Sequence, residues 1–123
     1  MSIKRQQFGK AHEAMAAGYL KQQGYEILET NYRTRLGEID IIAKDRQTLV
    51  FIEVKARSSN RFGSPKGAVT PKKQMKMSMV ALEYLKRTHQ IRAKARFDVI
   101  SIQAVAGNPQ IELVKNAFEL AFG

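Results

Sequence analysis

Two strongly apolar segments joined by a short polar turn constrain this fold more than any other feature of the sequence. In "LGEIDIIAKDRQTLVFIEVKARS", residues 36–58, alternating and β-branched residues predict strands over residues 37–43 and 48–56. Charged residues nevertheless stand in the middle of both strands, at Asp40, Glu53 and Lys55. An ionised carboxylate is costly to bury unless it is paired or binds a metal ion, so these positions require a physical explanation.

Alternation of side chains along a strand separates these charges from the predicted core. In the first strand Glu38 and Asp40 share one face, while the apolar residues Ile39, Ile41 and Ala43 share the other. In the second strand the even-numbered positions are apolar and the odd-numbered positions carry the charges. We therefore expect each strand to have one apolar face and one charged face.

The turn between the two strands fixes their register. A loop of two residues at Arg46-Gln47, or of four residues at 45–48, gives the same pairing, whereas an odd-length loop would scramble the apolar face. Directly opposed residues in such a pair have Cβ atoms about 5 Å apart. The predicted cross-strand pairs are Lys44 with Leu49, Asp40 with Glu53, and Glu38 with Lys55.

Two carboxylates that face each other destabilise a strand pair, and a cation between them removes the repulsion. Oxygen ligands without cysteine or a nearby histidine suit Mg²⁺ or Mn²⁺ better than zinc. Such an ion can orient water and stabilise charge on a scissile phosphate, and Lys55 can position or deprotonate that water. The alternative is a solvated face on which Glu38 and Lys55 form an ordinary ion pair. That alternative does not explain Asp40 against Glu53.

The chain is strongly basic. It has 21 Lys and Arg against 11 Asp and Glu, a formal charge of +10, which favours nucleic acid over other polyanionic partners such as acidic lipid. Eight basic residues lie before and after the predicted acidic pair in the sequence and are candidates for phosphate contacts: Arg33, Arg35, Arg57, Arg61, Lys66, Lys72, Lys73 and Lys76. The absence of cysteine excludes a disulfide scaffold and suits a reducing cytoplasm. No segment has the pattern of a signal peptide or a membrane span, so a cytoplasmic protein is expected.

The remaining elements predict an α/β fold with a mixed sheet flanked by helices, in the order αβββαββ, as a single domain over residues 1–123. Helices are expected at residues 4–23 and 71–89, the second opened by Thr70-Pro71. Further strands are expected at residues 25–32, 95–105 and 111–118, the last two separated by a "GNPQ" turn. The predicted apolar stripes are Phe8, Ala11, Met15 and Tyr19 in the first helix, and Met75, Met79, Leu82 and Leu85 in the second.

Asp40, followed after twelve residues by Glu53-Val54-Lys55, resembles the signature of the PD-(D/E)XK nuclease superfamily, although residue 39 is Ile where that signature has a variable Pro. More specifically, "GKAHEAMAAGYLKQQGYEILETNYRTRLGEIDIIAKD", "VFIEVKARSS", "FGSP" and "AVTPKKQ" are similar to the YraN-type family of small bacterial proteins. This resemblance covers nearly all of the chain and implies a restriction-endonuclease-like fold. It implies that Asp40 and Glu53 are metal ligands and that Lys55 is the catalytic base or an electrostatic stabiliser.

The resemblance also adds Glu13 and Gln74 to the candidate catalytic residues. Glu13 matches a glutamate that many superfamily members carry near the metal on their first helix, and Gln74 resembles the site glutamine of some relatives. Each residue has an ordinary alternative of similar weight: a solvated Glu13, and a Gln74 that bonds to backbone at a helix end. Asp98 fits either a supporting polar residue or a simple salt bridge.

These features predict a nuclease that hydrolyses DNA phosphodiesters with Mg²⁺ or Mn²⁺, and that selects DNA structure rather than base sequence in repair or recombination. By analogy with small nucleases that resolve branched DNA, we also expect the protein to form a homodimer. The main alternative is a non-catalytic nucleic-acid-binding module that keeps the nuclease fold. RNA in place of DNA is a third possibility that the sequence leaves open.

Overall fold

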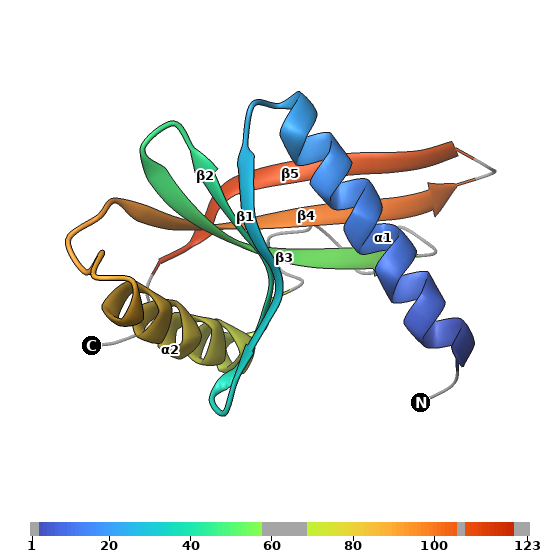
Figure 1. Ribbon diagram of the computed structural model, residues 1–123. Helices are drawn as coiled ribbons and strands as arrows, with labels where there is room; N and C mark the ends of the chain where they lie inside the picture. The colour runs from blue at the N-terminus through green and yellow to red at the C-terminus, as the bar shows by residue number, and fades with distance from the viewer. Residues whose placement is uncertain (1–2, 58–68, 106–107, 120–123) are drawn as a thin grey trace.

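The computed structural model describes residues 3–57, 69–105 and 108–119. Within these residues the element order is αβββαββ, as the sequence predicts (Figure 1). Arg61, Phe62 and Lys66 lie outside the described residues, and the side chains of Phe8 and Arg57 are likewise not described. The elements are α1 (Ile3–Gln22), β1 (Glu26–Thr34), β2 (Gly37–Asp45), β3 (Thr48–Arg57), α2 (Pro71–Arg87), β4 (Ala95–Val105) and β5 (Asn108–Phe118).

The strands form one mixed sheet in the sequential order β1-β2-β3-β4-β5. Neighbouring strands are antiparallel except β3 and β4, which are parallel. A parallel pair needs a long crossover connection, and α2 lies within that connection. The predicted α/β architecture, a mixed sheet flanked by helices, is confirmed.

A separate apolar cluster lies on each side of the sheet. Ala16 and Leu20 of α1 pack with Val50 and Ile52 of β3 on one side. Helix α2 packs on the other side, where the ring of Tyr84 meets that of Phe51 edge-on at 5.9 Å between centroids. The face of β3 expected to be charged is therefore apolar for its first half and becomes charged only at Glu53.

The strand β2 changes the side toward which its apolar residues point. Ile41 and Ala43 pack with α1, but Ile39 belongs to the cluster under α2, although all three were expected on one face. The change coincides with Asn31 of β1, which has a left-handed backbone (φ 53°) and lies between the β1–β2 pairs Thr30–Ile41 and Tyr32–Ile39. A positive φ is uncommon for a residue other than glycine, and here it departs from the extended backbone at the same level of the sheet at which the alternation of β2 changes.

The buried stripe of α2 differs from the predicted one. Met75 is 44% exposed, whereas Met77, Val80, Ala81 and Tyr84 are buried together with Leu85. The helix carries two apolar stripes, and the one that contains the aromatic ring and the β-branched residue packs on the sheet. The predicted start is confirmed: Thr70 is the N-cap, its hydroxyl accepts a hydrogen bond from the Lys73 amide, and Pro71 follows.

The buried face of α1 is also rotated relative to the prediction. Ala11 is exposed, and the fully buried residues are Ala16 and Leu20. Because residues three and seven apart share a helix face, Glu13 lies on the same side as Ala16 and Leu20. The ordinary alternative for Glu13 was a solvated side chain, but this rotation brings it toward the sheet and leaves it partly buried.

The last strand begins earlier than predicted. The "GNPQ" segment was expected to be a turn, but β5 starts at Asn108, and Pro109 lies opposite Ala104 in the β4–β5 ladder. Proline is tolerated here because β5 is the last strand in the described sheet order, and proline suits such an edge position. The other predicted elements agree with the structure to within about two residues at each end.

Asp98 is part of a buried ionic network. Its carboxylate is fully buried and accepts hydrogen bonds from Nε and Nη2 of Arg96 at 3.0 and 3.2 Å. It accepts two more, from the Tyr25 hydroxyl and from the backbone amide of Asn116. Arg96 also binds Asp45 at 2.8 Å. These contacts join the start of β4 to Tyr25 in the α1–β1 connection, to the end of β2 and to β5. Both alternatives given for Asp98 are thus partly right. Neither described helix is long and apolar enough to cross a membrane.

Candidate functional site

The predicted register of β2 and β3 holds through the hairpin. The turn falls at Arg46-Gln47, Lys44 pairs with Leu49, and the ladder continues to Ile41 and Ile52. The ladder ends there, one residue before the predicted pair of Asp40 with Glu53.

At the end of the ladder the side chain of Asp40 contacts β3. Its Oδ2 atom accepts a hydrogen bond of 2.8 Å from the backbone amide of Val54. Glu53 precedes Val54 on β3, and its carboxyl lies close enough to that of Asp40 to raise the pKa of Asp40. The structure therefore brings the two predicted metal ligands together through their side chains, at a point where the strands separate.

This environment changes the acidity of Asp40. Burial, together with the neighbouring Glu53 carboxyl, raises the pKa of Asp40 to about 7, while the Val54 amide and Lys73 oppose the shift. Asp40 is consequently poised to exchange a proton near neutral pH. A carboxyl group with this property can release its proton to a metal ion, because cation binding favours the ionised form.

Glu53 is almost completely buried and has two cationic partners. Its Oε2 atom lies 3.7 Å from the Lys55 ammonium group and 3.5 Å from that of Lys73. Lys55 was predicted in the site, but Lys73 was predicted only as a nucleic-acid contact. No sequence pattern could predict the contact between Lys73 and Glu53, because it forms only when α2 packs on the sheet.

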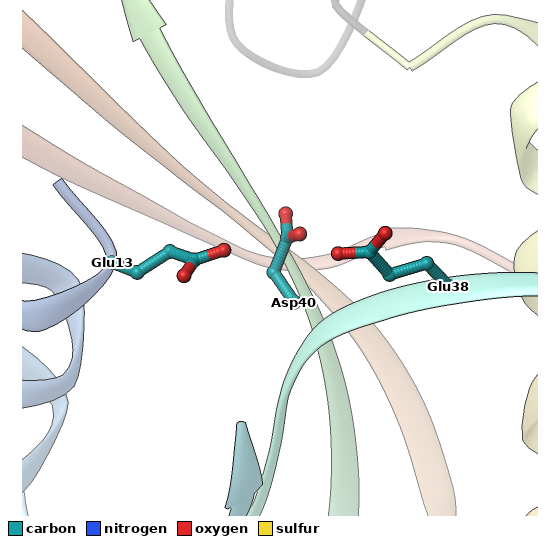
Figure 2. A group of neighbouring side chains, drawn as sticks. All are labelled: Glu13, Glu38 and Asp40. Carbon is teal, nitrogen blue, oxygen red and sulfur yellow. The ribbon is translucent and has the colours of Figure 1, made fainter. Parts of the chain in front are cut away.

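Two further carboxylates, those of Glu13 and Glu38, lie on opposite sides of Asp40 (Figure 2). One oxygen from each of Glu13, Glu38 and Asp40 lies within 4.8 Å of the others, a spacing that could hold a metal ion. Burial raises the pKa of Glu13, and the negative charges of Asp40 and Glu38 add to that effect, while a hydrogen bond from Asn31 opposes it. The interpretation of Glu13 as a residue beside the acidic pair thus agrees with its position.

Glu38 has a different partner from the one expected. It forms an ion pair with Arg33 of the neighbouring strand β1 at 3.3 Å, instead of the predicted pair with Lys55. The reason is that β2 has already left β3 at this position and pairs only with β1. Sequence reasoning did not include Glu38 among the candidate ligands, although its position two residues before Asp40 was a usable signal.

Gln74 bonds to the backbone at a helix end, which is the ordinary alternative given for it above. Its side-chain amide donates a hydrogen bond of 3.0 Å to the carbonyl of Val69, just before the N-cap of α2. This contact holds the entry to the helix.

The described basic candidates gather around the acidic site from two elements. Arg33 and Arg35 are exposed beside the β1–β2 turn, and Lys72 and Lys76 are exposed in the first half of α2. These two groups are neighbours, because Gly37 at the start of β2 lies against Lys76. Five of the eight candidates have described side chains: these four exposed cations, and Lys73, which lies on Glu53 beside Lys55.

The residues present suit a hard divalent cation. The site offers only carboxylate oxygens, with no cysteine in the chain and no histidine in this group, and such donors favour Mg²⁺ or Mn²⁺. Asp40 lies between Glu13 and Glu38 in this group, and Glu53 adjoins it from β3. The surrounding cations suit a polyanion, because phosphate contacts in nucleic-acid complexes come largely from Arg and Lys.

Comparison with known proteins identifies relatives over nearly the full chain. The model of uncharacterised protein family UPF0102 matches residues 12–102, a span that contains every described carboxylate of the site. A UPF0102 protein of Syntrophus aciditrophicus is 52% identical over 94% of this chain and 91% of its own length. Similar proteins of Geobacter metallireducens and Desulfosudis oleivorans are 49% and 50% identical, over 99% and 97% of this chain and 100% and 95% of their own.

Proposed function

We propose that this chain, which belongs to uncharacterised protein family UPF0102, is a nuclease that hydrolyses DNA phosphodiesters with the help of Mg²⁺ or Mn²⁺. The observation that carries the proposal is the meeting of Asp40 and Glu53 where β2 and β3 separate, with the Lys55 ammonium group 3.7 Å from Glu53. Two adjoining carboxylates in a partly buried position are unfavourable for folding, so a chemical role explains them better than a structural one.

In this proposal each residue of the site has one role. Asp40 and Glu53 would hold the metal ion, and Glu13 and Glu38 are placed to hold it directly or through water. The ion would supply a Lewis acid for the scissile phosphate and an orienting centre for the attacking water. Lys55 positions that water and balances the negative charge that develops on the phosphate.

The charge of the protein supports nucleic acid as the substrate class. Arg33, Arg35, Lys72 and Lys76 are exposed beside the carboxylates, and the formal charge of the whole chain is +10. Contacts between such side chains and the phosphates of a nucleic acid do not depend on the base sequence. Selection of a branched or otherwise distorted DNA structure, as in repair or recombination, is the expectation that follows, with a homodimer as a further prediction by analogy.

A non-catalytic nucleic-acid-binding module remains a second candidate because of one specific feature. Lys55 and Lys73 together can neutralise Glu53 without any metal ion. In that case the site would be a set of internal ion pairs, and the exposed cations alone would define the function.

The two candidates are separated by a cleavage assay. Labelled linear, flapped and branched DNA, and RNA of the same sequences, are incubated with purified protein in Mn²⁺, in Mg²⁺ and in chelator. The nuclease predicts metal-dependent cleavage that falls by a factor of about 100 or more in Asp40→Ala, Glu53→Ala and Lys55→Ala, with little further loss in the double variants because the residues act as a unit. Cleavage by Asp40→Ala or Glu53→Ala at the wild-type rate would reject the assignment of the site.

A further inference from the structure

Two ammonium groups from different elements converge on one oxygen of Glu53. Lys55 lies two residues further along β3, whereas Lys73 reaches the same Oε2 atom from the first turn of α2, at 3.5 Å. The Glu53 side chain is only 4% exposed, and a carboxylate in such a position needs compensating positive charge. Lys73 supplies part of that charge in the metal-free protein.

The same oxygen is part of the proposed metal site, and this creates a conflict. A divalent cation on Glu53 and two ammonium groups within 4 Å of it would repel each other, because like charges at such separations interact strongly even near a protein surface. Lys55 is anchored on the strand beside Glu53. Both lysine side chains are 39% exposed, but Lys73 comes from the first turn of a separate element, α2, and its long flexible stem lets the ammonium group move into solvent away from Glu53.

We propose that Lys73 is a placeholder for the divalent cation at Glu53, and that metal binding releases it to contact a nucleic-acid phosphate. The inference rests on the metal site of the proposed function. Lys73 lies beside the exposed Lys72 in the first turn of α2, so the released ammonium group joins the described cations around the site. The affinity for nucleic acid then depends on metal, and by thermodynamic reciprocity nucleic acid raises the affinity for metal by the same factor.

Lys73→Gln tests the competition directly when Mn²⁺ affinity is measured by calorimetry without nucleic acid. Removal of the competing charge should tighten Mn²⁺ binding by about threefold to tenfold. Lys72→Gln removes the same charge from the adjacent, exposed position and should change the affinity by less than about twofold. Lys73→Arg keeps the charge and should bind Mn²⁺ like the wild type.

The release of Lys73 is tested by the anisotropy of a labelled DNA duplex, on samples in which a gel shows the duplex intact. Lys73→Gln should bind the duplex like the wild type in chelator and about threefold or more weakly in Mn²⁺. Lys72→Gln should weaken binding by the same factor in both conditions, because its contact does not depend on metal.

The outcomes separate this inference from the proposed function. Equal or weaker Mn²⁺ binding by Lys73→Gln, or an equal loss of DNA affinity with and without Mn²⁺, would overturn the placeholder role while leaving the nuclease standing. A wild-type protein that binds no Mn²⁺ would reject both. If Lys73→Gln binds Mn²⁺ more tightly but the wild type cleaves no substrate, the nuclease activity is rejected, while the competition between Lys73 and the metal ion at Glu53 is supported.

Discussion

The carboxylate of Asp40 accepts a hydrogen bond from the amide of Val54 at the point where the β2–β3 ladder has already ended. A side-chain contact thus links the two strands beyond the last backbone pair, Ile41 with Ile52. This fixes Asp40 beside Glu53 while the two strands separate, and it leaves room for Glu13 and Glu38 to approach from the other sides (Figure 2). The acidity, metal affinity and stability of the protein follow from this arrangement.

The stability of the metal-free protein should fall as the pH rises toward neutrality. The folded-state pKa of Asp40 is raised from 3.8 to about 7, so its contribution is fully favourable below about pH 4 and is lost as the pH rises through 7. Asp40→Asn keeps an oxygen for the Val54 amide but does not ionise. The free energy of unfolding, measured in urea with chelator, should therefore shift in favour of the variant between pH 5 and pH 8, and at pH 8 the variant should be the more stable protein.

Asp45→Asn serves as a control of opposite sign for that measurement. A hydrogen bond from Arg96 lowers the pKa of Asp45, so this carboxylate stabilises the protein above its unfolded-state pKa and the variant should be less stable at neutral pH. An Asp40→Asn protein that is less stable than the wild type by the same amount at both pH values would assign a structural role to Asp40.

Mn²⁺ affinity should rise with pH and then level off. Below about pH 7 the ion must displace a proton from Asp40, so the affinity should increase by up to about tenfold per pH unit and become constant above pH 8. Calorimetry between pH 5.5 and 8.5 gives this profile. Asp40→Asn should bind weakly with little dependence on pH, and in millimolar Mn²⁺ the wild type should become the more stable protein. A wild-type profile that is flat across this range would exclude Asp40 as a ligand.

Neutralising Arg35, Lys72 and Lys76 together should weaken DNA binding equally for all sequences. The slope of log K against log salt should become less steep by up to about 0.9 for each phosphate that the variant no longer neutralises. The control is the triple variant of Arg46, Arg92 and Lys94, which are exposed near the other end of the sheet and change the net charge by the same amount. Equal effects in the two triple variants would show that net charge, and not a local surface, determines binding.

Asp98→Ala should be strongly destabilising. The carboxylate is fully buried and bonded to Arg96, Tyr25 and the Asn116 amide, so its removal leaves a half-buried guanidinium with less compensation and should cost about 3–5 kcal/mol. Urea unfolding at pH 7 measures this loss. Asp45→Asn, which weakens a more exposed partner of the same arginine, should cost about 1 kcal/mol. A loss for Asp98→Ala as small as that for Asp45→Asn would mean that the network contributes little to stability.

Local patterns in the sequence were enough to predict the element order and the register of β2 and β3 from their turn to Ile41 and Ile52. Both depend on local rules: a turn of even length and the alternation of apolar residues fix which residues face each other, so Asp40 and Glu53 could be brought together without a structure. The N-terminus of α2 at Thr70 and Pro71 was readable for the same reason, since a cap involves residues three apart in sequence.

The tertiary structure alone decided what surrounds that pair. The buried stripe of α2 was wrongly predicted because the helix has two apolar stripes, and only packing selects between them. Ile39 packs in the other core from Ile41, at the level of the left-handed Asn31 of β1, and no periodicity in β2 indicates this change. Lys73 reaches Glu53, and Glu13 reaches Asp40, from helices whose rotation on the sheet is set by long-range burial. Sequence patterns report the neighbours of a residue along its own strand or helix, whereas a site built from four elements is assembled only when those elements pack.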